Sequence, residues 1–223
     1  MSMKFFLSAI AKFTLGVVLI GVLLFLPAGT LRYPQGWLLM GILFIPMFLA
    51  GLVMMAKNPA LLRSRLNAKE KRGEQSLVVK LSGLMFLVGF IAAGMSFRFD
   101  WWMLPQWVSI LGTVLFLASY ALYAEVLRQN TWLSRTIEVQ EGQTVVSTGL
   151  YGIVRHPMYA VTLVLFLSMP LVLRSALAFV VFLAYPAIIA GRLLDEERFL
   201  AAELPGYSEY MQKVKWRLIP FVW

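Results

Sequence analysis

The chain has 223 residues, of which 60% are hydrophobic and 14% are charged. Soluble domains contain about 45–50% apolar residues, so this composition excludes an ordinary soluble domain and predicts an integral membrane protein. The sequence has no cysteine and one histidine, which excludes disulfides, thiolate catalysis and cysteine-based metal sites.

Apolar runs along the chain are long enough to cross a hydrocarbon core of about 30 Å, which takes about 20 residues in a helix. We therefore predict an all-α, polytopic integral membrane protein with about six transmembrane helices. The first run is longer than a signal-peptide core and is expected to be an uncleaved span. The runs are Phe5–Ala28, Trp37–Ala56, Leu81–Phe97, Met103–Leu127, Pro157–Leu173 and Ala176–Leu194.

The positive charges are distributed unevenly between the two sides of these predicted helices. Of the 20 Lys and Arg residues, only Arg32, Arg98 and Arg174 fall on one side. Positive residues are retained on the cytoplasmic side, so both termini are predicted to be cytoplasmic. The net charge of +9 then indicates contact with anionic lipid headgroups rather than with nucleic acid.

Three polar segments divide the chain. Residues 1–128 are predicted to hold the first four helices and a basic cytoplasmic loop, 57–80. This loop is predicted to lie on the membrane surface as an amphipathic stretch that starts at Asn58 and Pro59. Residues 129–223 are predicted to form a C-terminal region that binds a cofactor. Its loop, 128–156, lacks a helical period, and a loop of this length is usually functional. In its tail, Pro205 and Gly206 predict a turn, followed by a short helix.

The last two apolar runs are separated by Leu173, Arg174 and Ser175 alone, which predicts a tight antiparallel hairpin. At about 1.5 Å per residue, each arm rises roughly 25 Å over 17 residues, so Arg192 returns to the depth of His156. A polar cluster is therefore expected at the cytoplasmic mouth of the hairpin. Its members are Arg155, His156, Tyr159, Arg192, Asp195, Glu196 and Glu197.

Two interpretations of this cluster are open. Pro157 suits the first helical position and leaves a positive helix end that can receive a carboxylate or phosphate. Alternatively, His156 is an interfacial cap, and Arg192 pairs with Glu196 four residues later while reaching water. Ionisable residues that enter a span often mark a site, which favours a functional cluster. Glu125, by contrast, is expected to be a helix-end interfacial carboxylate.

The segments "VVSTGLYGIVRHPMY", "RLLDEE" and "LPGYSEYMQKVKWRLIP" resemble the C-terminal half of the isoprenylcysteine carboxyl methyltransferase family, which is related to the membrane phospholipid methyltransferases. The resemblance extends from about residue 140 to Trp223. In the front half, "YPQGW" and "NPALLRSR" look like bacterial members of that family. The resemblance implies an S-adenosylmethionine-dependent methyltransferase of the bacterial inner membrane that acts on a lipid-like or amphipathic acceptor, without an obligate protein partner.

The same resemblance implies roles for particular residues. Arg192 would face the reacting group of the acceptor, and Arg192 and Glu196 are the candidate catalytic residues. A carboxylate acceptor is already ionised at pH 7, whereas an amine or thiol would need a base such as Glu196 or Glu197. The residues that would bind the cofactor are Gln140, Gln143, Thr144, Val145, Val146, Tyr151, His156, Pro157, Met158, Tyr159 and Glu196.

Two alternatives belong to other functional classes. An NADPH-dependent reductase of the sterol type has a similar C-terminal pattern, but "RLLDEERF" is less basic than a site for a 2′-phosphate should be. A transporter or a non-catalytic scaffold is the second alternative. Proline breaks at Pro46, Pro170 and Pro186 fit a transporter, although the charges gather at one face.

Overall fold

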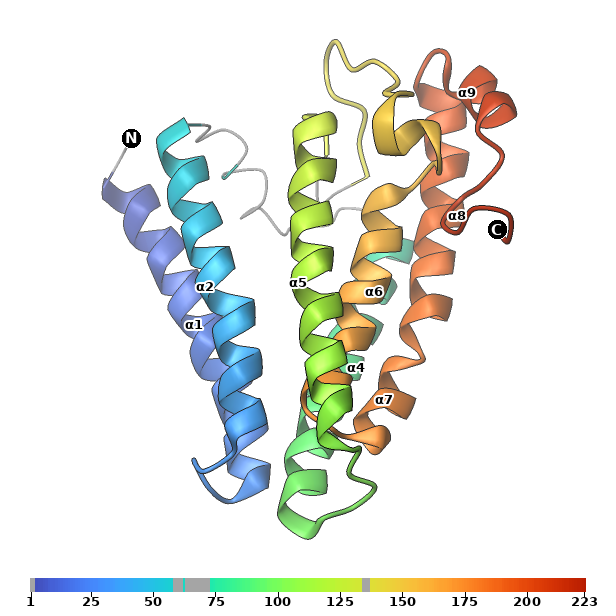
Figure 1. Ribbon diagram of the computed structural model, residues 1–223. Helices are drawn as coiled ribbons and strands as arrows, with labels where there is room; N and C mark the ends of the chain where they lie inside the picture. The colour runs from blue at the N-terminus through green and yellow to red at the C-terminus, as the bar shows by residue number, and fades with distance from the viewer. Residues whose placement is uncertain (1–2, 58–61, 63–72, 134–136) are drawn as a thin grey trace.

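A computed structural model describes residues 3–57, 62, 73–133 and 137–223, and in these residues every regular element is a helix. The all-α class is therefore confirmed (Figure 1). The elements are α1 (Met3–Ala28), α2 (Pro34–Lys57), α4 (Gly73–Phe99), α5 (Gln106–Gln129), the 3₁₀ turn η1 (Gly149–Gly152), α6 (Pro157–Val172), α7 (Ala176–Phe182), α8 (Tyr185–Glu203) and α9 (Tyr207–Lys213).

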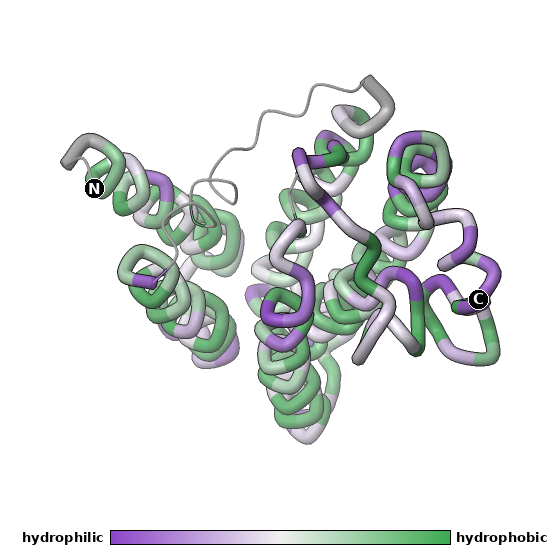
Figure 2. The backbone as a smooth tube through the Cα atoms, turned by 90° about the horizontal axis from the view of Figure 1, so that it is seen from above, coloured by the Kyte–Doolittle hydropathy of each residue, from purple (hydrophilic) through white to green (hydrophobic). Residues whose placement is uncertain are grey.

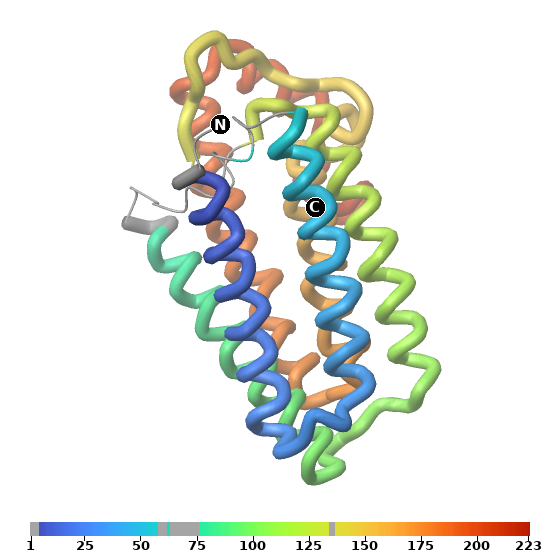
Figure 3. Tube along the Cα trace, turned by 90° about the vertical axis from the view of Figure 1, so that its left-hand side faces the viewer, coloured from blue at the N-terminus to red at the C-terminus, as the bar shows by residue number. Residues whose placement is uncertain are grey.

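Each predicted apolar run lies in a helical segment, and the protein is a polytopic membrane protein. Four single helices, α1, α2, α4 and α5, and the α7–α8 segment are long and apolar enough to cross a membrane. Helix α6 is shorter, at 16 residues. The helices lie side by side along one direction (Figure 3), and apolar residues dominate them, whereas polar residues gather in the loop and tail at one end (Figure 2).

The structure corrects the extents of several spans. The last run is not one continuous helix from Ala176 to Leu194: α7 ends at Phe182, and α8 begins at Tyr185 and continues to Glu203. Pro186 lies in the first turn of α8. Because proline has no N–H and its ring clashes with the preceding turn, it is favoured in the first turn of a helix. Of the three expected proline breaks, only the one at Pro186 is found, because Pro46 lies inside α2 and Pro170 lies inside α6.

Two other helix boundaries differ from the predicted ones for local reasons. Helix α5 begins at Gln106 rather than Met103, because Pro105 caps it with an extended backbone (ψ 154°). Helix α4 begins at Gly73 and so includes Lys80, which had been placed in the basic loop. The predicted surface stretch of that loop, at 58–72, lies outside the described residues except for Leu62. The predicted tail helix is confirmed as α9.

The hairpin between α6 and α7 is confirmed, and its turn is firmly anchored. The hydroxyl of Tyr33 donates to the carbonyl of Leu173 (3.1 Å), and that of Ser109 donates to the carbonyl of Val172 (2.8 Å). Helices α5 and α6 approach closely at Gly112, where an added Cβ would lie 2.7 Å from the amide nitrogen of Val172. The hairpin is thus fixed at the end opposite to the polar residues.

The start of α1, the C-terminal tail and the loop before η1 lie at the same end of the bundle (Figure 1). The turn after α1, the last turn of α4 and the turn after α6 lie at the other end. They carry Arg32, Arg98 and Arg174, the three Arg residues predicted on the less basic side. The arrangement of the helices is therefore the one that the charge asymmetry predicted. Which end faces the cytoplasm stays a prediction.

Candidate active site

A pocket lies where the polar ends of α6 and α8 meet the loop before η1 and the tail helix α9. Of the twelve residues predicted to bind or react, ten line it: Gln143, Thr144, Val145, Val146, Tyr151, His156, Met158, Tyr159, Arg192 and Glu196. The geometric expectation that Arg192 returns to the depth of the Arg-His-Pro motif is confirmed by its contact with Tyr159, where Arg192 Nε lies 3.0 Å from Tyr159 Oη.

The other two predicted residues do not line the pocket. The Gln140 side chain donates to the carbonyl of Trp132 (2.7 Å), and the Gln140 amide donates to Oε1 of Gln143 (2.9 Å). Gln140 therefore shapes the loop that carries Gln143. Pro157 is buried at the start of α6, where its fixed φ suits the first helical position.

Sequence reasoning missed about half of the lining. Leu200 and Leu204 could have been found, because they follow Glu196 at intervals of four on one helix face. Tyr207 and Tyr210 are three apart on α9 and share a face for the same reason. The segment before η1 has no periodicity that would single out its members. The unpredicted lining residues are Asn130, Trp132, Leu133, Ile137, Glu138, Leu200, Leu204, Tyr207 and Tyr210.

Tyr159 joins the two candidate catalytic residues. Its buried phenol donates a short hydrogen bond to the carboxylate of Glu196 and accepts one from Nε of Arg192 (3.0 Å). The ring of His156 stacks on that of Tyr159, with centroids 5.6 Å apart and planes 20° apart. A cation, a carboxylate and two stacked rings therefore line one pocket in a fixed arrangement.

Glu197, the next residue after Glu196, has a different environment. Its carboxylate accepts from Nε of Arg155 (2.6 Å) and Nε of Arg217 (2.9 Å), and Nε2 of His156 lies 3.2 Å away. Glu197 is 4% exposed and does not line the pocket. Of the two candidate bases for an amine or thiol acceptor, only Glu196 faces the pocket.

Arg155 extends this network to the tail. Its guanidinium also donates to the carbonyls of Val214 (2.9 Å) and Lys215 (3.2 Å). The backbone adds two further bonds, from the amide of Arg155 to Trp216 and from the amide of His156 to Arg217. The tail is thus fastened to the start of α6, and this holds α9 against the pocket.

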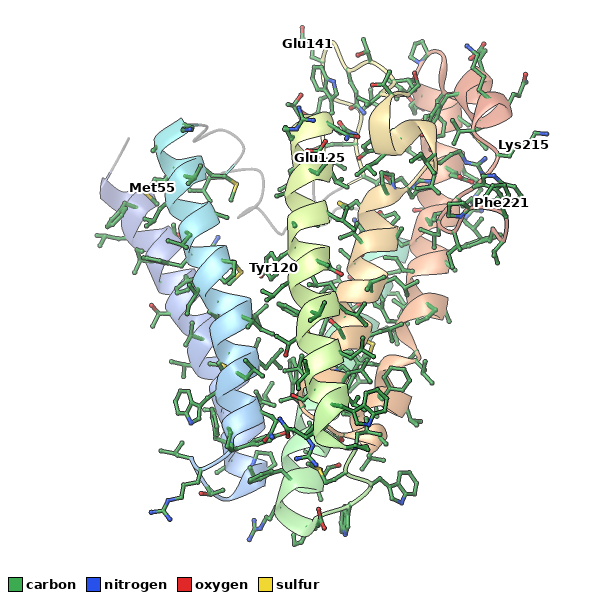
Figure 4. The ribbon with its side chains drawn as sticks, in the orientation of Figure 1. Met55, Tyr120, Glu125, Glu141, Lys215 and Phe221 are labelled. Atoms are coloured by element: carbon green, nitrogen blue, oxygen red, sulfur yellow. The ribbon has the colours of Figure 1, made fainter. Side chains whose placement is uncertain are left out.

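The C-terminal end of α5 supports the part of the pocket that η1 forms. Oε1 of Gln129 accepts from the amide of Leu150 in η1 (2.8 Å), and Nε2 of Gln129 donates to Glu125 (2.6 Å). Glu125 also pairs with Arg128, at 2.7 Å. The expected helix-end position of Glu125 is confirmed (Figure 4), and its carboxylate orients the glutamine that holds η1.

Two tyrosines of α9 complete the pocket. The Tyr210 hydroxyl donates to the carbonyl of Tyr151 (2.7 Å). The Tyr207 hydroxyl is buried and has no hydrogen-bond partner among the described residues. Burial raises the pKa of both phenols above the ordinary value, so both remain neutral hydrogen-bond donors across the physiological pH range.

Residues 110–202 match the family model of the isoprenylcysteine carboxyl methyltransferase (ICMT) family. This region, which is less than half of the chain, is therefore similar to that family. The matched residues contain the whole hairpin and, with it, His156, Tyr159, Arg192 and Glu196. The α9 part of the pocket and the first two helices lie outside the matched region.

Two individual proteins are similar to part of this chain. The cobalt-zinc-cadmium resistance protein CzcN of Cupriavidus metallidurans is 32% identical over 132 residues, which cover 57% of this chain and 57% of that protein. The chain therefore spans just over half the length of that relative. The Delta(14)-sterol reductase of Mus musculus is 32% identical over 91 residues, which cover 40% of this chain and 22% of the reductase.

A solved structure of the eukaryotic intramembrane Ras methyltransferase ICMT has the same fold. The superposition has a TM-score of 0.59, with 19% sequence identity, and covers 96% of this chain and 77% of that one. The shared fold extends through the first two helices, which the family model does not match.

Proposed function

We propose that this protein is a membrane-embedded, S-adenosylmethionine-dependent methyltransferase that methylates a lipid-like or amphipathic acceptor, with a carboxylate of the isoprenylcysteine type as the preferred acceptor. One observation supports this most strongly. The ICMT-family region forms a pocket in which Tyr159 joins Arg192 to Glu196.

The chemistry of the pocket fits the cofactor. S-adenosylmethionine carries a carboxylate, an ammonium group, hydroxyls and a sulfonium cation. Glu196 offers a carboxylate for the ammonium group or the hydroxyls, and the rings of His156 and Tyr159 offer cation–π attraction for the sulfonium. The buried Tyr207 hydroxyl lacks a partner within the described residues and offers a donor. When bound, the cofactor supplies an electrophilic methyl group.

Arg192 is the residue that we assign to the acceptor. A guanidinium matches a carboxylate in shape and charge, and Tyr159 restricts its movement through the 3.0 Å hydrogen bond to Nε. A carboxylate is already ionised at pH 7, so no residue has to remove a proton. The contribution of the protein is then alignment of the reacting groups, which can supply about 7–11 kcal/mol of the barrier.

The position of the pocket suggests how the two substrates arrive. It lies at the polar end of the bundle, next to the loop and the tail. We assign this end to the cytoplasm and the protein to a bacterial inner membrane. The cofactor would enter from water, and the acceptor would enter laterally from the lipid between helices. This part of the proposal fails if purified protein methylates only fully water-soluble acceptors.

The deciding experiment is calorimetric titration of detergent-purified protein with S-adenosylmethionine and, separately, with NADPH. We expect S-adenosylmethionine to bind, and Glu196→Ala and His156→Ala to weaken its binding at least tenfold. Glu141→Ala, at the tip of the exposed loop (Figure 4), is the control that should leave it unchanged. Binding of NADPH instead would favour a reductase, the second candidate, which the partial similarity to the sterol reductase supports.

A second measurement identifies the acceptor. Tritiated S-adenosylmethionine should transfer its label to a prenylated cysteine with a free carboxyl group, and the product should release volatile methanol in base, as methyl esters do. The same cysteine without the prenyl group should accept no label. Transfer to an amine or thiol lipid would retain the methyltransferase and overturn the carboxylate assignment.

A further inference from the structure

Tyr207 is a buried polar residue whose hydroxyl has no partner among the residues that the structure describes. The residue is 5% exposed and lines the pocket. Buried hydroxyls nearly always have a hydrogen-bond partner, and one left without a partner lowers the stability of the fold. A residue that retains such a group next to a pocket is a candidate ligand contact.

The surrounding chain holds the Tyr207 ring in place. Gly206 adopts a left-handed conformation (φ 83°) that directs the chain from α8 into α9, and the amide of Tyr207 donates to the carbonyl of Leu204 (3.1 Å). The ring packs in a cluster with Leu204, Tyr210 and Val214, and it lies 5.6 Å from the ring of Tyr210. Its position is therefore set before any ligand binds.

We propose that Tyr207 binds the cofactor, by donating a hydrogen bond from its hydroxyl to an acceptor atom of S-adenosylmethionine. This inference rests on the proposed function and adds to it a contact that lies outside the family-matched region, 110–202. The bond would replace the missing partner. The Tyr207 hydroxyl would therefore make little or no contribution to the stability of the unliganded fold and a measurable contribution to affinity.

The cofactor is a better partner for this hydroxyl than the lipid acceptor. Tyr207 belongs to α9, which follows the last candidate span, Ala176–Glu203. Arg192, which we assign to the acceptor, lies within that span. Burial, together with the negative charges of Glu196 and Glu197, raises the pKa of the Tyr207 phenol. The phenol thus keeps its proton and can donate a hydrogen bond to a ring nitrogen, a ribose oxygen or a carboxylate.

Tyr210 provides a matched control on the same short helix. Both tyrosines are buried and line the pocket, but the Tyr210 hydroxyl already donates to the carbonyl of Tyr151 (2.7 Å). Removal of the Tyr210 hydroxyl leaves that carbonyl without its donor. Substitution by phenylalanine should therefore have opposite effects at the two positions.

The test compares Tyr207→Phe, Tyr210→Phe and the unsubstituted protein by calorimetric titration with S-adenosylmethionine and by thermal unfolding without ligand. Tyr207→Phe should raise Kd about tenfold, which corresponds to about 1.4 kcal/mol, and should leave the unliganded Tm unchanged or higher. Tyr210→Phe should lower the unliganded Tm.

Each remaining outcome overturns the inference in a recognisable way. If the unsubstituted protein does not bind S-adenosylmethionine, the proposed function fails and this inference fails with it. If the unsubstituted protein and Tyr207→Phe bind equally well, the function stands and the Tyr207 contact is wrong. If Tyr207→Phe unfolds at a lower temperature without ligand, or does not fold, the hydroxyl has a structural role instead.

Discussion

Arg155 and Glu197 form a buried ion pair between the residue before the His-Pro motif and the polar end of α8, with 2.6 Å between Nε and Oε1. Both side chains are about 5% exposed or less. Removing one partner of such a pair leaves a buried charge uncompensated, which typically costs about 3–5 kcal/mol. The pair fastens the tail, with α9, to the start of α6.

We therefore expect Glu197→Gln to lower the free energy of unfolding by about 3 kcal/mol, measured by thermal unfolding in detergent. Arg198→Ala is the control, since Arg198 is 73% exposed and lies 3.8 Å from Asp195. Exposed pairs contribute at most about 1 kcal/mol. Equal losses in the two variants would contradict the assignment of Glu197 as the anchor of the tail.

Tyr159→Phe should affect catalysis more than folding. It removes the hydroxyl that donates to Glu196 and accepts from Arg192, while the ring and its stack on His156 remain. Hydrogen bonds to charged groups contribute about 1.5–3 kcal/mol, so kcat/KM should fall roughly tenfold to a hundredfold. A methyl-transfer assay measures this, and activity within twofold of the unsubstituted protein would show that the bridge is not needed.

Arg192→Lys should separate the acceptor from the cofactor. A lysine keeps the charge but loses the planar fork that matches a carboxylate. We expect kcat/KM for a carboxylate acceptor to fall at least tenfold, while the Kd of S-adenosylmethionine stays within about twofold. A large change in the Kd with unchanged turnover would place Arg192 in the cofactor site instead.

Gly149→Ala should destabilise the wall of the pocket at η1. The residue has φ +59°, and a Cβ there would lie 2.5 Å from Oε1 of Gln129, the atom that accepts from Leu150. A left-handed alanine costs about 1–2 kcal/mol, and displacement of Gln129 adds about 1 kcal/mol for each hydrogen bond lost. The Tm should fall, and the Kd for S-adenosylmethionine should rise.

Gly142→Ala is the matched control for that variant, because φ is +75° and no atom of the residues that the structure describes lies within 4 Å of an added Cβ. Gly142→Ala should lose only the free energy that a left-handed alanine costs. When Gln129→Ala is already present, adding Gly149→Ala should lower the free energy of unfolding only by as much as Gly142→Ala does. If the losses of the two single variants are additive instead, the Gln129 side chain does not clash with a Cβ at Gly149.

The orientation in the membrane can be tested with introduced cysteines, because the natural chain has none. Glu141 and Arg32 are both exposed and lie on segments at opposite ends of the bundle. In intact bacterial cells, a membrane-impermeant maleimide should label Arg32→Cys and should label Glu141→Cys only after the membrane is opened. The reverse pattern would invert the topology and move the pocket to the outer side.

Periodicity and length were sufficient to predict the secondary structure of this chain, with errors where one residue acts against the pattern. The six apolar runs gave helices because burial of their backbone in lipid leaves no alternative. Hydropathy did not reveal the break before Tyr185, because a proline changes backbone hydrogen bonding without changing apolarity. Hydropathy also placed the end of α8 too early, at Leu194 rather than at Glu203, because the helix continues into the charged segment that begins at Asp195.

Part of the pocket could likewise be predicted from the sequence, and part could not. The three-residue turn after α6 sufficed to bring Arg192 back to Tyr159, since two helices of equal rise must return to the same depth. The roles of the two neighbouring glutamates could not be read from "DEER", because they depend on which helix face packs against the tail. Tertiary contacts direct Glu197 to Arg155 and Arg217, and Glu196 to Tyr159 and the pocket.

The sequence alone determined that this protein crosses the membrane as helices, that its charges gather at one end, and that the Arg-His-Pro motif meets the end of the last helix. These properties follow from local composition and helix geometry. Only the tertiary structure decided that α9 and residues 130, 132, 133, 137 and 138 complete the pocket. It also decided that Tyr207 is left with a buried hydroxyl and no partner among the described residues. Those contacts join segments more than 50 residues apart, and no local pattern records which of them touch.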